Sequence, residues 1–445
     1  MMLTDLIEKA KRVLEGNWQG GFTKPAPALY PHQWNWDSGF IAIGYARYNQ
    51  QRAQQELSTL FRAQWKNGML PQIVFNPAAL GGYFPEPDFW QCERSPNAPE
   101  GILTSGITMP PVHAIAARRI YQFAGDRDQA REWLEAIYPK IFALHEYFYR
   151  ERDPHQEGLV YIRHPWESGL DNSPTWDEPL KAIQIDKSQL PPYERKDLKK
   201  GVPASQRPSD EDYDRFVYLV DLFRRLNYDE QAIYSECPFL VQDPLFNSIL
   251  AQATEDLIEI GKLLGKDTGR LEECYQQTNR ALREKLWDPT HGAFDTYDLR
   301  AGRLIETETA SGFMPLLSGA PTREMAATIY RFLESNSFCT MHNNACFSIP
   351  NYNLEGEYLD PANYWRGPVW INTNWLLMQG LKRYGFKQKA MSVREDIIEL
   401  VRRWGFHEYF DPFKGIGYGT DNFSWTAALF IDAALEKLEE MGGSP

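Results

Sequence analysis

The sequence predicts an all-α protein of one domain, in which pairs of helices carry long loops to one face. Apolar residues recur with the helical period almost wherever a period can be read. Alternating, strand-like patterns are short and few: GLVYI from Gly158, and a hairpin around residues 292–305. No flexible linker divides the 445 residues, so we expect a single unit, residues 1–445, rather than two or three domains.

Each predicted helix rests on a stripe of apolar residues. The stripes cover residues 3–14, 133–148, 249–264, 271–282, 390–404 and 425–435. The stripe at 249–264 runs through GKDTG directly into the next one, which predicts two antiparallel helices joined by a short turn. We find no sequence repeat, so the pairing of helices is inferred from spacing alone.

Long loops rich in proline, glycine and aromatic residues separate the helices. They cover residues 18–39, 71–110, 161–215, 338–368 and 405–424. Loops of this length in a compact domain are usually functional or disordered, and the aromatic content argues against disorder. The segment 181–214 is polar and locally basic in an acidic protein. We expect it to be either a solvated loop or a lid over a negatively charged substrate.

Charge and composition narrow the class of partner. The net charge of −13 and the sequence pI near 5.2 argue against nucleic acid and anionic membranes as partners. No apolar run reaches the length of a membrane span, and the first twenty residues lack the apolar core of a signal peptide. The five cysteines, odd in number and without CxxC spacing, suit neither a disulfide framework nor a zinc site. These observations favour a cytoplasmic location.

Several kinds of catalytic site have no motif in the sequence. The GIGYG stretch at 415–419 lacks the Lys-Ser/Thr of a phosphate loop. The eight histidines form no HExxH motif and no cluster at metal spacing, and there is no GxSxG elbow. We therefore expect no metal and no cofactor, and carboxylates remain as the candidate catalysts.

Five loop segments combine aromatic residues with polar or charged ones. They are YPHQWNWDSGF (30–40), GGYFPEPDFW (81–90), HPWESGLDNSPTWD (164–177), NYWRGPVWINTNW (363–375), and HEYFDP with FSWTAAL (407–412 and 423–429). A single tryptophan is more often a packing residue than a ligand platform. A pyranose, however, has apolar faces that lie on aromatic rings and hydroxyls that need polar groups around the rim. Five such clusters predict a sugar-binding site.

Hydrolysis of a glycosidic bond needs two carboxyl groups, one protonated and one ionised. Asp171 is the favoured acid, because it lies in a tight loop between Trp166 and Trp176, where burial would raise its pKa. Glu408, among aromatic residues in a late loop, is the favoured base. Other acidic residues of the clusters compete for these roles: Glu167, Asp177, Asp37 and Asp411.

The motifs WNWDSGF, ESGLDNSPTWD, NYWRGPVW and EYFDPFKGIGYGTDNFSWTAAL, in this order, resemble glycoside hydrolase family 63 in its short bacterial and plant branch. The resemblance spans roughly Tyr30 to Leu429, and the pattern is similar, more loosely, to that of trehalases. It implies an (α/α)6 barrel, a toroid of six helical hairpins, with the site at the loop-rich end of its axis. It also implies an inverting mechanism with an Asp acid, a Glu base and no cofactor.

Motif by motif, the resemblance implies that Asp171 is the general acid and Glu408 the general base. The donor sugar would lie among residues of the first and fourth motifs: Tyr30, Trp34, Trp36, Asp37, Tyr364, Trp365, Arg366 and Trp370. Tyr83, Trp166 and Gly169 of the second and third clusters are further substrate-binding candidates.

The chain is little longer than the barrel itself requires. In this it resembles the mannosylglycerate and glucosylglycerate hydrolases of this branch, which release a hexose and glycerate. Arg207 and Tyr213, six residues apart, match the spacing with which those enzymes recognise the acceptor. A glycerate carboxylate would be held bidentately by Arg207, which would explain the basic character of segment 181–214. Both glucose and mannose stay open as the hexose, and the sequence carries no signal for the oligomeric state.

Three other functions stay open. The chain would be an α-glucosidase if neutral disaccharides were its better substrates. An (α/α)6 sugar epimerase would use two histidines as acid and base, and His164 and His407 lie in the motif loops. That function leaves the carboxylate motifs unexplained. A non-catalytic sugar-binding protein would need the aromatic platforms but has no use for two opposed carboxylates.

Overall fold

The computed structural model describes residues 2–199, 201–340 and 345–442. The longer helices are α1 (Leu3–Asn17), α2 (Asn35–Ala46), α3 (Gln50–Leu60), α5 (His113–Gln122), α6 (Arg127–Glu151), α9 (Asp210–Arg225), α10 (Glu230–Glu236), α11 (Pro244–Leu264), α12 (Gly269–Ala281), α14 (Arg323–Leu333), α15 (Ile371–Arg383), α16 (Lys387–Trp404) and α17 (Ser424–Glu440). The short helices are α4 (Pro87–Trp90), α7 (Pro165–Ser168), α8 (Asp177–Lys181) and α13 (Pro315–Ser318). The hairpin of α11 and α12 begins and ends close to the predicted stripes.

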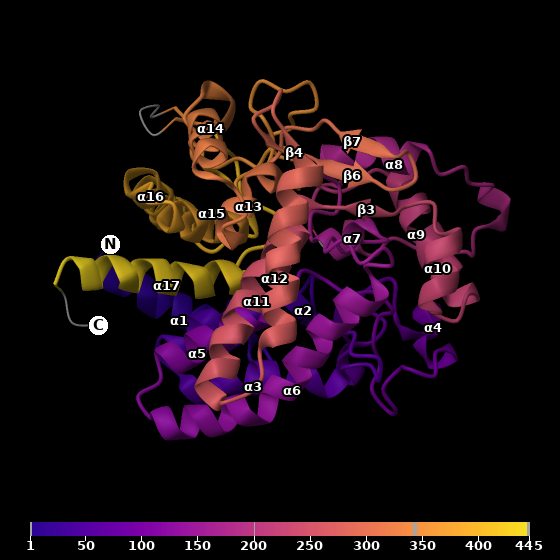
Figure 1. Cartoon of the computed structure of the whole chain (residues 1–445), viewed down its shortest axis with the longest axis horizontal. Helices are drawn as coiled ribbons and strands as arrows, with labels where there is room; N and C mark the ends of the chain where they lie inside the picture. Colours follow the sequence, from indigo (N-terminus) through magenta and orange to yellow (C-terminus); the bar gives the residue numbers. More distant parts are fainter. Residues whose placement is uncertain (1, 200, 341–344, 443–445) are drawn as a thin grey trace.

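Six of these helices form a closed inner ring. Their order is α2, α5, α11, α13, α15 and α17, each packed on the next, and α17 packs back on α2. Outer helices lie behind the ring, with α3 on α2, α6 on α5, α12 on α11, α16 on α15 and α1 on α17. All twelve residues of α2 are buried, because this helix has neighbours on every side, whereas α12 buries only one stripe. The arrangement is the predicted (α/α)6 barrel (Figure 1).

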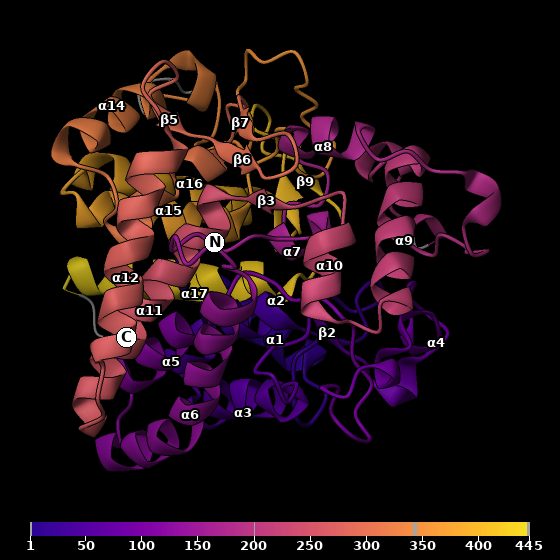
Figure 2. The same cartoon turned by 45° about the vertical axis from the view of Figure 1, so that its right-hand side comes forward.

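The long loops gather at one end of the barrel. The loops at 18–39, 71–110, 338–368 and 405–424 lead into the N-terminal ends of the inner helices α2, α5, α15 and α17. Figures 1 and 2 place α4, α8, α9 and α10 together on one side of the molecule, at the right of both views. The N-terminal ends of several inner helices therefore point at the loops that carry the aromatic clusters.

Short antiparallel strands hold these loops together. β1 (Gln33–Trp34) pairs with β2 (Ile73–Val74), β4 (Trp287–Asp288) with β5 (Ala293–Phe294), and β8 (Tyr409–Phe410) with β9 (Gly417–Tyr418). β6 (Thr296–Asp298) pairs with both β3 (Val241–Gln242) and β7 (Arg303–Ile305). The pair of β6 and β7 confirms the hairpin predicted around residues 292–305.

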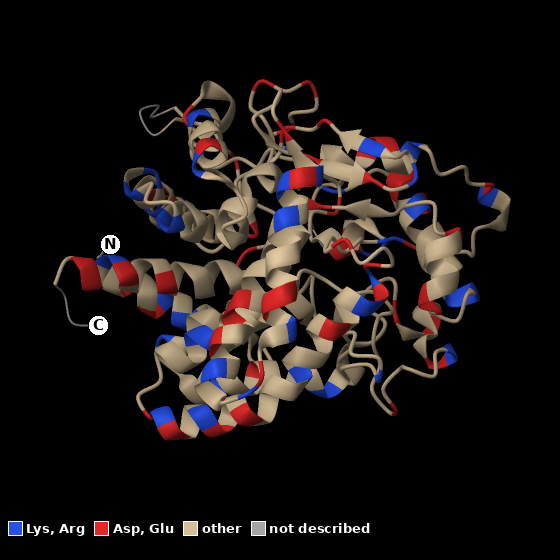
Figure 3. Ribbon diagram, viewed as in Figure 1, with Lys and Arg blue, Asp and Glu red and all other residues tan. Residues whose placement is uncertain are grey.

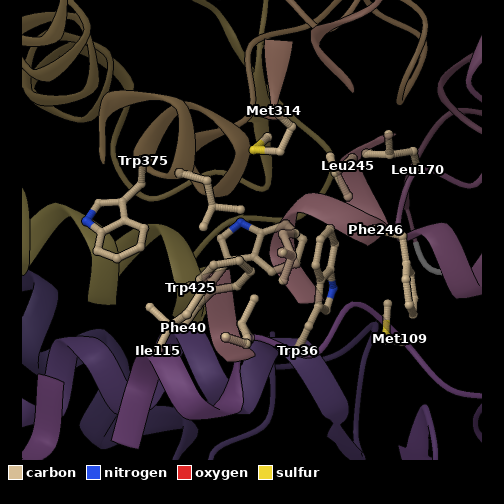
Figure 4. Close-up of a cluster of buried hydrophobic side chains, with 14 of the residues drawn as sticks. Trp36, Phe40, Met109, Ile115, Leu170, Leu245, Phe246, Met314, Trp375 and Trp425 are labelled. Carbon is tan, nitrogen blue, oxygen red and sulfur yellow. The ribbon is translucent and has the colours of Figure 1, made fainter. Parts of the chain in front are cut away.

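Large apolar side chains fill the inside of the ring. Figure 4 shows Trp36 and Phe40 of α2 lying beside Trp425 of α17, and the ring centroids of Trp36 and Trp425 are 5.5 Å apart. Gly44 allows the same two helices to approach closely, since a Cβ atom there would lie 2.5 Å from Cα of Ala428. The inside of the barrel is therefore packed where α2 meets α17. We expect a ligand site at the end of the barrel that carries the long loops.

Charged residues of both signs line the outer helix α6. Figure 3 shows Lys and Arg interspersed with Asp and Glu along α6, as expected for a solvated helix face. None of the helices in the described part of the chain is long and apolar enough to cross a membrane.

One expectation about the cysteines is wrong. Cys339 and Cys346 form a disulfide, with Cα atoms 5.8 Å apart. A turn can bring two cysteines together whatever the total count, because bonding depends on the distance and direction of the two side chains rather than on CxxC spacing. Cys92, Cys237 and Cys274 are buried and carry no disulfide. The cysteines therefore no longer support a reducing compartment, and the cytoplasmic location stays a prediction.

Candidate active site

A cavity opens among the loops, lined by polar and aromatic side chains. All five aromatic clusters contribute to its wall. The predicted site residues that line it are Tyr30, Trp34, Trp36, Asp37, Tyr83, Trp166, Gly169, Asp171, Arg207, Tyr213, Tyr364, Trp365 and Glu408. The fold thus brings together side chains that are up to 378 positions apart, such as Tyr30 and Glu408.

The acid candidate reaches the cavity through a sharp turn after α7. Gly169 ends that helix in the left-handed conformation, with φ near +75°. A Cβ atom on Gly169 would lie 2.4 Å from the ring of Trp36, so only glycine lets the turn approach the aromatic wall. Beyond the turn, Asn172 accepts a hydrogen bond from the backbone N–H of Trp365 at 2.9 Å. These contacts hold the loop of Asp171, in the third motif, against the fourth motif.

The environment of Asp171 favours its protonated form. Burial raises its pKa to about 7; the negative charge of Glu408 adds to this, while the Arg207 guanidinium opposes it. The predicted direction of the shift is therefore confirmed. A carboxyl group with this pKa holds its proton in a large fraction of molecules at neutral pH, as a general acid must.

Glu408 has different surroundings. Its side chain is 1% exposed, and hydrogen-bond donors or positive charge face both oxygens. The Tyr30 hydroxyl donates to Oε1 at 2.8 Å, and the Thr420 backbone N–H donates to Oε2 at 3.3 Å. Nη2 of Arg207 is 3.6 Å from Oε2. Asp171 and Glu408 thus face one cavity in unlike environments, which is how one site keeps an acid and a base together.

The competing carboxylates divide into two groups. Asp37 lines the cavity, and burial raises its pKa well above the usual range, with Glu408 among the charges that add to the shift. The others are engaged elsewhere. Glu167 binds the Arg152 guanidinium at 2.9 Å and 3.0 Å, Asp177 binds an arginine, and Asp411 accepts backbone N–H groups of its own loop. Of the four competitors, Asp37 alone is placed to touch a ligand.

Arg207 enters the cavity from segment 181–214. Its Nη1 donates to the Tyr30 hydroxyl at 3.0 Å. Nε and Nη2 are buried and form no hydrogen bond to any residue that the structure describes. Tyr213 lines the same cavity, and its hydroxyl donates to the backbone carbonyl of Phe84 at 3.2 Å. The segment therefore covers part of the cavity, and its movement as a lid stays a prediction.

Arg366 and Trp370 are not among the residues that line the cavity, and their contact with the sugar stays a prediction. Arg366 forms two hydrogen bonds with Asp177, at 2.7 Å and 2.8 Å. Trp370 stacks behind Trp365 with ring centroids 3.6 Å apart, and its indole N–H donates to the carbonyl of Tyr364. Both residues support the wall from outside.

The histidines of the epimerase hypothesis lie outside the cavity as well. His164 accepts a hydrogen bond from the Trp166 N–H through Nδ1, and its Nε2 lies 3.2 Å from the carbonyl of Phe216. His407 lines a separate groove with Trp404 and Asp421, and burial lowers its pKa. Neither ring faces the place where a sugar would lie.

Some lining residues were not predicted. They are Pro25, Leu29, Gln72, Met109, Asp197, Pro208, Phe423 and Trp425. Phe423 and Trp425 belong to the FSWTAAL motif, so their cluster was recognised although the individual side chains were not. Gln72, Met109 and Asp197 lie in the long loops at positions without a distinctive pattern.

A group with metal-ligand spacing lies elsewhere. Asp288, His291 and Asp295 offer ligand atoms within 4.8 Å of one another in the β4–β5 hairpin. Nδ1 of His291 is 3.0 Å from Asp295, so the two side chains already satisfy each other. None of the three lines the cavity described above.

Comparison with known proteins supplies the family. Residues 30–426 match the model of the mannosylglycerate hydrolase MGH1-like glycoside hydrolase domain. The chain is 48% identical over 432 residues to a mannosylglycerate hydrolase of Rubrobacter radiotolerans, covering 97% of each protein. It is 37% identical over 437 residues to a glucosylglycerate hydrolase of Mycolicibacterium hassiacum, covering 96% of this chain and 97% of the relative.

A solved structure agrees with these relatives. The crystal structure of the GH63 mannosylglycerate hydrolase of Thermus thermophilus, in complex with Tris and D-glycerate, superposes with a TM-score of 0.89 at 43% identity. The match covers 96% of this chain and 99% of that one. The chain therefore belongs to the mannosylglycerate hydrolase MGH1-like branch of glycoside hydrolase family 63, and it is a glycosidase.

Proposed function

We propose that the protein is an inverting hydrolase of α-glycosides of glycerate, releasing mannose or glucose together with glycerate. The observation that carries this proposal is the edge of Arg207 formed by Nε and Nη2. Both atoms are buried and neither donates a hydrogen bond to a described residue, although Nη2 lies 3.6 Å from Oε2 of Glu408. These two nitrogens form the edge of a guanidinium that binds a carboxylate with two parallel hydrogen bonds.

A neutral acceptor would leave that edge unsatisfied. Each buried donor without a partner costs about 1–3 kcal/mol, and more when the group is charged. Glycerate supplies a carboxylate that can accept hydrogen bonds from both of these Arg207 nitrogens. The relatives named above as mannosylglycerate and glucosylglycerate hydrolases, and the D-glycerate in the Thermus thermophilus structure, support the same acceptor. The charge of Arg207 therefore favours glycerate glycosides over neutral disaccharides.

The sugar ring would lie against the aromatic wall. Trp34, Trp36 and Trp365 line the cavity and offer faces for the apolar side of a pyranose. Asp37, whose pKa burial raises, would serve as a hydrogen-bonding partner for sugar hydroxyls. Glucose and mannose differ in one hydroxyl, so both fit this description.

Cleavage uses the two carboxyl groups in one step. Asp171 gives its proton to the glycosidic oxygen as the bond to the anomeric carbon breaks, and glycerate leaves. Glu408 accepts a proton from a water molecule that attacks the anomeric carbon from the opposite face. The α-glycoside therefore yields the β-hexose first. Asp171 ends ionised and Glu408 protonated, and exchange with solvent restores both.

The test is proton NMR of the anomeric region during turnover of α-mannosylglycerate and α-glucosylglycerate in parallel. We expect early signals of the β-hexose, before mutarotation, and no signal from an Asp171→Asn variant. The α-hexose as first product would contradict inversion. Faster turnover of a neutral α-linked disaccharide than of either glycerate compound would instead identify an α-glucosidase.

A further inference from the structure

Segment 181–214 contributes a carboxylate to the cavity wall, in addition to Asp37, Asp171 and Glu408. Asp197 begins a short turn, Asp197–Lys199, and lines the same cavity as Arg207, Pro208 and Tyr213. The chemistry proposed above gives it no task. A negative charge in a pocket for an anionic acceptor is unfavourable unless it recognises something, so its neighbours decide what it can do.

Arg195 fixes the Asp197 carboxylate. Its Nε donates to Oδ1 at 3.2 Å and its Nη2 to Oδ2 at 2.8 Å. Nη1 donates to the carbonyl of Pro208 at 2.9 Å and to Asp210 at 2.8 Å. All three nitrogens of Arg195 are therefore engaged within the protein. Arg195 offsets the charge of Asp197, but it has no free edge with which to hold a ligand carboxylate.

The same contacts place Asp197 near Arg207. Pro208 follows Arg207 in the chain, and Arg195 bonds both to Pro208 and to Asp197. The guanidinium of Arg195 also lies 4.4 Å from the ring of Tyr213, the other predicted acceptor residue. Each oxygen of an ionised carboxylate accepts about two hydrogen bonds, so the single bonds from Arg195 leave Asp197 with capacity to accept more.

The acceptor itself has two groups to be recognised. Glycerate carries one carboxylate and two hydroxyls, and the glycosidic bond uses one hydroxyl, so one remains free. Arg207 attracts the carboxylate and Asp197 repels it, whereas a hydroxyl can donate to Asp197. We propose that Asp197 is a specificity-determining residue that accepts a hydrogen bond from the free hydroxyl of glycerate, while Arg207 holds the carboxylate. This inference rests on the proposed function.

Lactate is the informative comparison, because it is glycerate without its terminal hydroxyl and keeps the carboxylate. A hydrogen bond to a charged group is worth about a 10- to 100-fold preference. We expect kcat/KM of the wild type to be lower by this factor for α-mannosyl lactate than for α-mannosylglycerate. In Asp197→Ala the two values should agree within about threefold.

Two further variants make the comparison specific. Asp197→Asn keeps an oxygen that can accept the hydroxyl, so it should retain most of the preference for glycerate. Asp186→Ala changes an aspartate of the same segment that caps Ser188 outside the cavity, and it should leave the ratio of the two substrates unchanged. Any effect of a freed Arg195 on carboxylate binding cancels in the ratio, because both substrates carry a carboxylate.

The outcomes separate the two proposals. If the wild type hydrolyses neither hexosylglycerate, the proposed function is wrong and this inference falls with it. If it hydrolyses α-mannosylglycerate but treats α-mannosyl lactate equally well, the function stands and the role of Asp197 is wrong. A preference that persists in Asp197→Ala overturns the role in the same way.

Discussion

The hydroxyl of Tyr30 donates a hydrogen bond to Oε1 of Glu408 at 2.8 Å, and its oxygen accepts one from Nη1 of Arg207 at 3.0 Å. One phenol thus connects the proposed base to the proposed carboxylate-binding residue. Tyr364 lies 3.3 Å from it, hydroxyl to hydroxyl. The three groups come from distant parts of the chain, and this hydroxyl links them.

Removing that hydroxyl should lower activity without unfolding the protein. In Tyr30→Phe, Glu408 and Arg207 each lose one hydrogen bond, and bonds to charged groups are worth about 1.5–3 kcal/mol. We expect kcat for α-mannosylglycerate to fall about 10- to 100-fold. The control is Tyr218→Phe on α9, because the Tyr218 hydroxyl has no hydrogen-bond partner among the described residues. Equal kcat in the two variants would refute the role of Tyr30.

The pH dependence of the reaction should report Asp171. The acid must be protonated, and its pKa is raised to about 7 by burial, so kcat/KM should fall as the pH rises through about 7. Asp171→Asn cannot donate the proton and should lower kcat by about 10²–10⁴-fold. Initial rates between pH 5 and 9 measure both effects. A wild-type rate that stays flat across this range would show that another group is the acid.

The same shift predicts a change in stability. In the unfolded chain an aspartic acid ionises near about 3.9, whereas folded Asp171 does so at about 7. Between these values the native state holds a proton that the unfolded state has lost, so stability falls as the pH rises. Asp171→Asn should therefore have a higher Tm than the wild type at pH 8, and the difference should shrink towards pH 4. A difference independent of pH would argue against a raised pKa.

Gly169 should resist substitution more than other glycines of similar backbone conformation. In Gly169→Ala the new Cβ would meet the Trp36 ring at 2.4 Å, whereas Gly265, with φ near +69°, has nothing within 4 Å. We expect Gly265→Ala to lose about 1–2 kcal/mol of unfolding free energy from the left-handed backbone alone. Gly169→Ala should lose a further 1–3 kcal/mol or so from the overlap, and most of its activity. Urea unfolding of both variants checks the difference.

Glu167 should contribute to stability rather than to catalysis. It is fully buried beneath the acid loop, where it binds Arg152 and accepts hydrogen bonds from the backbone N–H groups of Arg163 and Thr108. Glu167→Gln leaves two buried arginines, Arg152 and Arg163, to share the carboxylate of Glu230, and breaking a buried pair costs about 3–5 kcal/mol. The partly exposed pair of Arg131 and Glu135 is the control, since Glu135→Gln should cost at most about 1 kcal/mol. Similar unfolding midpoints in urea would contradict this assignment.

Much of the fold was open to prediction because the helices bury regular stripes. The stripe at 249–264 lies within α11, and the stripe at 271–282 coincides with α12 to within one residue at its end. The aromatic loops surround one cavity, as expected. Motif position also identified most of the cavity wall. Arg366 lies beside Trp365 in the chain, but it binds Asp177 and does not line the cavity. Adjacent residues share a motif without sharing a side-chain direction.

Periodicity and local composition predicted the helical architecture and the loops that carry chemistry, because both can be read along the chain. Motif position predicted the pair of candidate carboxylates. Which side chains meet depends on the folded arrangement. The pKa of Asp171 is raised to about 7 because the folded chain buries this residue. The disulfide of Cys339 and Cys346 forms because the fold brings the two cysteines within bonding distance. The burial of Nε and Nη2 of Arg207 and the place of Asp197 in the same cavity wall depend on loops that are brought together only when the ring of helices closes.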